Sequence, residues 1–111
     1  MPVATFAEVA AAVRASQGIP AGQRIDTATL IEDDLGITGD DGCALLEELE
    51  STFGIAFAGA DGTLRAAFGL APDEYLFHGE GWSVFRKDKV RPLAVGELHR
   101  VIAALQLSGP A

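Results

Sequence analysis

The chain has 111 residues and is acidic: 16 Asp and Glu stand against 8 Lys and Arg, a formal net charge of −8 at pH 7. This length predicts a single domain, residues 1–111, with a modest hydrophobic core. The 49% hydrophobic content is ordinary for a globular protein. Because nucleic-acid phosphates would be repelled, the charge argues against nucleic acid and favours a basic protein partner.

The compartment is predicted from three further features of the sequence. No apolar run approaches the length of a membrane span, so no membrane contact is expected. The N-terminus lacks the basic-then-apolar pattern of a signal peptide. The single cysteine, Cys43, cannot form an intrachain disulfide, which suits a reducing environment. We therefore expect a cytoplasmic protein.

The first predicted helix begins at a capping box, because Thr5 and Glu8 have the Thr-x-x-Glu spacing. Apolar residues then recur with helical spacing, at Phe6, Val9, Ala10 and Val13. Gly18, followed by Pro20, ends this helix. A long link over residues 19–37 follows. Its apolar residues include Ile25, Leu30, Ile31 and Leu35.

The second predicted helix begins near residues 38–40, where Thr38 and Asp41 form a variant capping box. Clustered carboxylates there complement the positive end of the helix dipole. The expected buried stripe consists of Leu45, Leu46, Leu49 and Phe53. The residues expected to face outward are Glu47, Glu48 and Glu50. Gly54 ends the helix.

The region from residue 55 to residue 92 is divided by glycines into short pieces. Residues 63–68 suggest one or two helical turns, and residues 72–77 suggest another with Pro near its start. Alternating apolar residues at 55–57 and 82–85 suggest short strands, which leaves room for a small two-stranded patch.

The last predicted helix has a second apolar stripe, at Leu98, Val101, Ile102 and Leu105. Leu93 and Leu98 have the spacing of a hydrophobic staple around a cap at Ala94. Gly109 and Pro110 end the helix. Three amphipathic helices and a short one bury their stripes most economically as an antiparallel bundle, so the predicted fold class is mainly α.

The turn before the second helix reads Asp-Leu-Gly at residues 34–36, and the helix closes with Phe-Gly-Ile at residues 53–55. This layout resembles the central motif of acyl and peptidyl carrier proteins, over about residues 5–55 and the last helix. The longer stretch 58–92 is similar to an uncharacterised bacterial family of carrier-like proteins with an altered modification site. The resemblance implies an acyl-carrier-protein-like bundle.

In carrier proteins an Asp-Ser-Leu turn bears the phosphopantetheine arm on its Ser. Counted from Asp34, these positions fall on Thr38, Gly39 and Asp40. Gly39 has no hydroxyl to attack coenzyme A, so we expect no cofactor. The alternative is a carrier with a non-standard attachment site at Thr38 or Ser51. Thr38 is better explained as a helix cap, and Ser51 lies far down the helix.

Half of the sixteen acidic residues lie between residues 32 and 50, with no Lys or Arg among them. A solvated, solubilising face is the ordinary explanation of such a run. The resemblance implies a second one, because carrier proteins meet their enzymes through this helix. The predicted partner-binding residues are Asp33, Asp34, Asp40, Asp41, Glu47 and Glu48. Their partner would be a basic protein, with an enzyme of acyl or peptide biosynthesis as one candidate.

Other reactive side chains do not form a recognisable site. His78 and Glu80 are too few for zinc, and His99, on the last helix, is expected to be a helix-surface residue. Residues counted from Asp34 do not match a calcium loop. Cys43, with no His or Lys adjacent, is expected to be an inert, partly buried thiol. We therefore predict no metal site, no catalytic residues and no enzyme activity.

Four basic residues of the C-terminal third, Arg86, Lys87, Lys89 and Arg91, allow two interpretations. They could bind a phosphate or an acidic patch of a partner, or they could pair with the protein's own acidic helix, which is the preferred expectation given the net charge. The preferred function is a non-catalytic, carrier-protein-like module that acts by protein–protein interaction through this helix. Besides the non-standard carrier, the other alternative is an acidic inhibitor or immunity-type bundle that blocks a basic enzyme.

Overall fold

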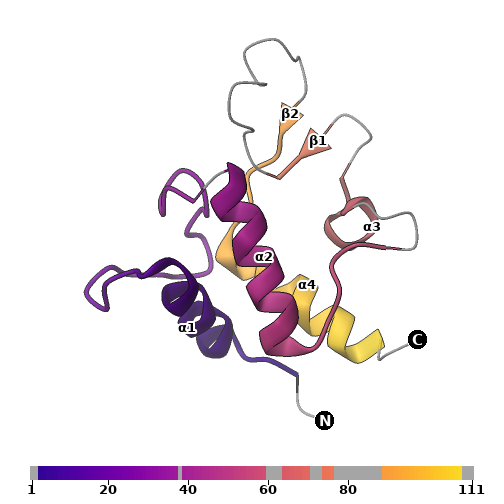
Figure 1. The fold of residues 1–111 in the computed structure, drawn as a ribbon, viewed down its shortest axis with the longest axis horizontal. Coiled ribbons are helices and arrows are strands. Elements are labelled where there is room, and N and C mark those ends of the chain that lie inside the picture. The colour runs from indigo at the N-terminus through magenta and orange to yellow at the C-terminus, as the bar shows by residue number, and fades with distance from the viewer. Residues whose placement is uncertain (1–2, 38, 60–63, 71–73, 77–88, 109–111) are drawn as a thin grey trace.

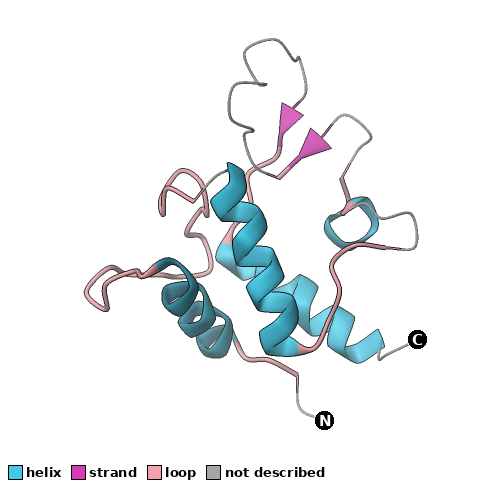
Figure 2. Cartoon of the chain, in the orientation of Figure 1, coloured by secondary structure: helices cyan, strands magenta, loops and turns pink. Residues whose placement is uncertain are grey.

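The computed structural model describes residues 3–37, 39–59, 64–70, 74–76 and 89–108. This described part is mainly helical, with three main helices and a helix of one turn (Figures 1 and 2). The helices are α1 (Phe6–Gln17), α2 (Gly39–Phe53), α3 (Arg65–Phe68) and α4 (Val95–Ser108). Helix α1 packs against α2 and α4, and α3 packs against α4. The predicted helical bundle, with three main helices and a short one, is confirmed at this level.

Helix α1 has the predicted capping box at its N-terminus. The Thr5 Oγ1 accepts from the Glu8 amide at 3.2 Å, and the Glu8 carboxylate accepts from the Thr5 amide at 2.8 Å. These bonds satisfy amide groups that a helix start leaves without intrahelical partners. Gly18 ends the helix in the left-handed conformation, with φ of 63°. Val9 and Val13 turn inward and are fully buried.

Helix α2 begins at Gly39 and ends before Gly54, close to the predicted bounds. The expected cap at Thr38 lies outside the described residues. The side chains predicted to be inward, Leu45, Leu46 and Leu49, are buried. Phe53, predicted to be the last residue of the buried stripe, is half-buried. The apolar spacing therefore gave the correct rotational orientation of this helix.

The link between α1 and α2 closes over the start of α4. The Thr29 carbonyl accepts from the Val95 amide at 2.9 Å, and the Thr27 carbonyl accepts from the Gly96 amide at 3.0 Å. Gly96 is required for this close approach, because a Cβ there would lie 2.7 Å from the Thr27 carbonyl oxygen. Backbone carbonyls of the link thus satisfy two first-turn amides of α4.

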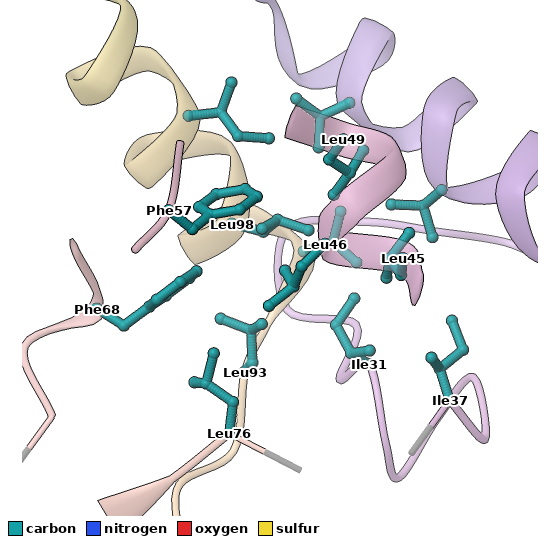
Figure 3. Packing of buried hydrophobic residues seen from close by; sticks show 14 of the residues in the cluster. Ile31, Ile37, Leu45, Leu46, Leu49, Phe57, Phe68, Leu76, Leu93 and Leu98 are labelled. Atoms are coloured by element: carbon teal, nitrogen blue, oxygen red, sulfur yellow. The ribbon is translucent and has the colours of Figure 1, made fainter. Parts of the chain in front are cut away.

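The core gathers side chains from every helix and from the connecting segments (Figure 3). Leu93 and Leu98, the predicted staple around Ala94, are both buried in it, and α4 begins directly after Ala94. The connecting segments contribute Ile31, Ile37, Phe57 and Leu76. The rings of Phe57 and Phe68 pack with centroids 5.4 Å apart. The core therefore continues beyond α1, α2 and α4 into the region after residue 55.

That region differs from the expectation for it. The predicted strand at 55–57 is wrong, because these residues form no strand and the Phe57 amide donates to the Glu50 carboxylate. A short parallel pair instead joins β1 (Glu74–Tyr75) to β2 (Lys89–Val90). The helical turn predicted over 72–77 is therefore wrong at residues 74–76, where tertiary pairing overrides local preference.

The helical turn predicted within 63–68 is confirmed at Arg65–Phe68. The strand predicted at 82–85 lies outside the described residues, and so does the predicted end of the last helix at Gly109 and Pro110.

Candidate interaction face on helix α2

Helix α2 carries exposed carboxylates on its solvent-facing surface. Asp40 and Asp41 lie in the first turn and Glu47 and Glu48 lie two turns later, and all four are exposed. This set is called here the acidic face. Helical spacing places Asp40 and Glu47 opposite the buried leucines, and Asp41 and Glu48 at the edge of the buried stripe, next to Leu45. The helix contains no Lys or Arg. The acidic face is therefore a surface of one charge sign on a well-packed helix.

No ion pair within the described part of the chain engages this face. The ion pairs that join described residues are Arg24 with Asp26 and Arg91 with Glu97. Asp40 and Asp41 complement the positive end of the α2 dipole, whereas Glu47 and Glu48 are beyond its first turn. The helix dipole thus gives the first two carboxylates a structural role, and no ion pair between described residues gives one to Glu47 or Glu48.

The other two predicted partner-binding residues, Asp33 and Asp34, lie in the turn before α2, and both are exposed. The Asp34 carboxylate accepts from the Leu30 amide at 2.7 Å. The Leu30 carbonyl in turn accepts from the amides of Asp34 and Leu35 at 3.0 and 3.1 Å. Asp34 therefore stabilises its own turn, which is a structural role that the predicted binding role did not include.

Glu50 corrects the expectation that it faces outward with Glu47 and Glu48. It is half-buried, and its carboxylate accepts from the Phe57 amide at 2.8 Å. Its backbone carbonyl accepts from Gly54 and Ile55, so Glu50 organises the reversal of the chain after α2. The Phe57 amide lies beyond the end of α2, so the residue spacing within the helix contained no signal of this role.

Gly39, at the expected position of the modified Ser, is the first residue of α2 and has φ of 55°. This left-handed conformation disfavours any side chain with a Cβ. Ser51 is exposed near the opposite end of the helix. The start of α2 is therefore shaped for glycine at position 39, and no hydroxyl is present there.

His99 is not the helix-surface residue that was expected. It is half-buried, with its Nε2 2.9 Å from the Ala4 carbonyl oxygen and its ring edge-on to Phe6. The Gln106 side chain accepts from the Ala4 amide at 2.7 Å. These two side chains of α4 hold the chain just before α1. Because the contacts span about a hundred residues of sequence, no local spacing rule could have found them.

Cys43 is exposed, so the expectation of a partly buried thiol is wrong. Position 43 lies on the helix between the buried Gly42 and the exposed Ala44. Its rotation away from Leu45 and Leu46 places it outside the core.

Arg91 corrects the expectation that the basic residues pair with α2. Its guanidinium binds Glu97 of α4 at 2.9 Å and donates to the carbonyls of Phe68 and Gly69. Arg86 and Lys87 lie outside the described residues, and Lys89 is described only through its backbone pairing. Because the three partners of Arg91 come from two separate segments, no local pattern of residues predicts this arrangement.

Comparisons with models of protein families, with curated proteins and with solved structures found no match to the chain. None of the described helices is both long enough and apolar enough to cross a membrane. The described residues also bring together no group of three His, Cys, Asp or Glu side chains that would suit a metal ion.

Proposed function

We propose that this protein is a non-catalytic, carrier-protein-like module that lacks phosphopantetheine and binds a basic protein partner through the acidic face of α2. The observation that carries the proposal is the contrast between the buried leucines and the exposed carboxylates of α2. One side of the helix is buried in the core, while the four carboxylates of the acidic face are exposed. The carrier-like layout of residues 34–55 adds to this support.

The electrostatics of the acidic face favour binding over a purely solubilising role. Like charges concentrated on one helix repel one another, whereas interspersed Lys would keep the surface charged at lower cost. A surface of one sign raises the rate of encounter with a partner of the opposite sign and fixes its orientation. The partner surface is therefore expected to be rich in Arg and Lys.

The absence of phosphopantetheine is tested by incubating the protein with coenzyme A and a broad-specificity phosphopantetheinyl transferase. The intact mass should stay unchanged, because Gly39 offers no hydroxyl. A stoichiometric gain of mass mapping to Thr38 or Ser51 would contradict the proposal and indicate a carrier with a non-standard attachment site.

Binding is tested by partner capture from the native cell with three forms of the protein as bait. The first is the unaltered chain, and the second carries Asp41→Asn, Glu47→Gln and Glu48→Gln, which remove three negative charges from the acidic face. The third adds three positive charges elsewhere, at exposed Ala11, Ala15 and Ala21 changed to Lys. The second and third baits therefore have the same formal net charge.

The unaltered chain and the Lys-bearing control should capture the same basic protein, and the neutralised variant should lose it. If all three folded baits capture the protein equally, the acidic face is not part of the interface. Equal loss by both variants would show that overall charge, and not this face, controls binding.

A further inference from the structure

Helix α3 is too short to be stable without contacts from elsewhere in the chain. It has four residues, Arg65–Phe68, and one helical turn does not recover the entropy lost in forming it. Phe68 is 3% exposed, and Leu64, Ala67 and Leu70 are partly buried against the core. Helix α3 therefore depends on the interactions that reach it from other segments.

A single side chain supplies a large part of that support. Arg91 donates from Nη1 to the carbonyls of Phe68 and Gly69, the latter at 3.2 Å, and from Nη2 to Glu97 at 2.9 Å. Carbonyls at a helix C-terminus lack intrahelical donors and carry partial negative charge, so a guanidinium stabilises them. Glu97, in the first turn of α4, holds the guanidinium in position.

The segment that Arg91 contacts packs against an aromatic side chain of the core. The rings of Phe68 and Phe57 are neighbours, with their centroids 5.4 Å apart (Figure 3). Phe57 is 1% exposed, and its backbone is fixed independently by the carboxylate of Glu50 on α2. If α3 moved away, the hydrogen bond from the Phe57 amide to Glu50 would remain, and the Phe57 ring would lose its contact with Phe68.

We propose that Arg91 is the latch of a lid formed by α3, which opens as a unit and uncovers Phe57 while α1, α2 and α4 remain folded. The side chains of Arg91 and Glu97 are 34% and 20% exposed, so solvent reaches the latch without unfolding the core. Local segments of a protein commonly open at free energies below that of global unfolding. This inference does not depend on the proposed function.

The test is amide hydrogen exchange of the full chain, followed by NMR. The Phe68 amide donates to the Leu64 carbonyl at 3.1 Å and so reports opening of α3. Amides of Val13 in α1 and Leu49 in α2, both in the core, report global unfolding. In the unaltered protein Phe68 should exchange faster than these two, through an opening that depends weakly on denaturant. Equal rates with equal denaturant dependence would overturn the proposal.

Three variants test whether the contacts of Arg91 control the opening of α3. Arg91→Ala should speed Phe68 exchange on the order of 10- to 100-fold more than it speeds exchange of Leu49, because hydrogen bonds from a charged group are lost. Glu97→Gln should give a smaller change in the same direction, since it leaves the guanidinium present and less well positioned. Arg100→Ala, at an exposed position of the same helix, is the matched control and should leave Phe68 unchanged.

If Arg91→Ala speeds amide exchange of Phe68 and Leu49 equally, Arg91 stabilises the whole fold and not α3 in particular, which would overturn the proposal. Unchanged Phe68 exchange would do the same. If Arg91→Ala does not fold, the comparison of Phe68 with Val13 and Leu49 in the unaltered protein still decides whether α3 opens separately.

Discussion

The buried leucines and the exposed acidic face of helix α2 differ in how strongly a substitution there should affect folding. Leu45, Leu46 and Leu49 are buried against the rest of the core, so their size and shape affect the whole fold. The acidic face is exposed, and no ion pair between described residues involves it. One side therefore determines whether the chain folds, and the other can be changed to test binding in a protein that remains folded.

The largest expected effect is on the buried side. Leu49→Ala should lower the free energy of unfolding by about 2–5 kcal/mol, because transfer energy is lost and a cavity remains. Leu49 is 1% exposed, at the centre of the stripe. Chemical denaturation measures the change. A cost below about 0.5 kcal/mol, the level of an ordinary surface substitution, would mean that α2 is rotated differently from the structure.

Glu50, at the border of the two sides, should give an intermediate effect. Glu50→Ala removes the acceptor of the Phe57 amide, and an unsatisfied amide in a partly buried place costs about 1–3 kcal/mol. Glu47→Ala is the matched control, since it removes the same side chain from an exposed position of the same helix. Equal unfolding free energies for the two variants would contradict the structural role of Glu50.

The first turn of α2 should give a smaller effect. Asp40→Asn and Asp41→Asn should each cost about 0.3–1 kcal/mol, because each removes a favourable charge from the positive end of the helix dipole. Thermal unfolding at low and high salt measures the change, and salt should reduce it. A loss that is independent of salt would indicate a role other than charge at these positions.

The smallest expected effect is in the middle of the acidic face. Glu48→Ala should change the unfolding free energy by no more than roughly 0.5 kcal/mol, because Glu48 is exposed and lies outside the helix ends. The same denaturation experiment as for Leu49→Ala provides the measurement. A loss of unfolding free energy as large as that of Leu49→Ala would contradict the assignment of Glu48 to the exposed surface of α2.

The parts of the fold that local spacing controls were predictable from the sequence. The capping box at Thr5 and Glu8 and the apolar stripe of α2 depend on residues three to four positions apart, which lie together on a helix. The start of α4 after Ala94 was found in the same way. For the candidate site, the exposure of Asp40 and Glu47 followed from the same helical spacing, because both lie opposite the buried leucines.

The parts that depend on distant segments were not predictable. His99 contacts Ala4, and Arg91 bridges α3 and α4, so neither arrangement leaves a signal in the neighbouring residues. Glu50 was assigned to the solvent side because its partner, the Phe57 amide, lies beyond the turn that ends α2. The parallel pair of β1 and β2 joins residues fifteen positions apart, as Glu74 with Lys89 shows. Tertiary context decides such short segments.

The proposed binding role is tested most directly by association kinetics with the captured partner, measured by stopped flow at increasing salt. The unaltered chain should associate fastest at low salt and slow as ionic strength passes about 0.1 M, where the Debye length is roughly 10 Å. The variant with Asp41→Asn, Glu47→Gln and Glu48→Gln should associate at least about tenfold more slowly, with weaker salt dependence. The control with Lys at positions 11, 15 and 21 should stay close to the unaltered chain. Equal association rates for the unaltered and neutralised chains, both folded, would contradict a docking role for the acidic face.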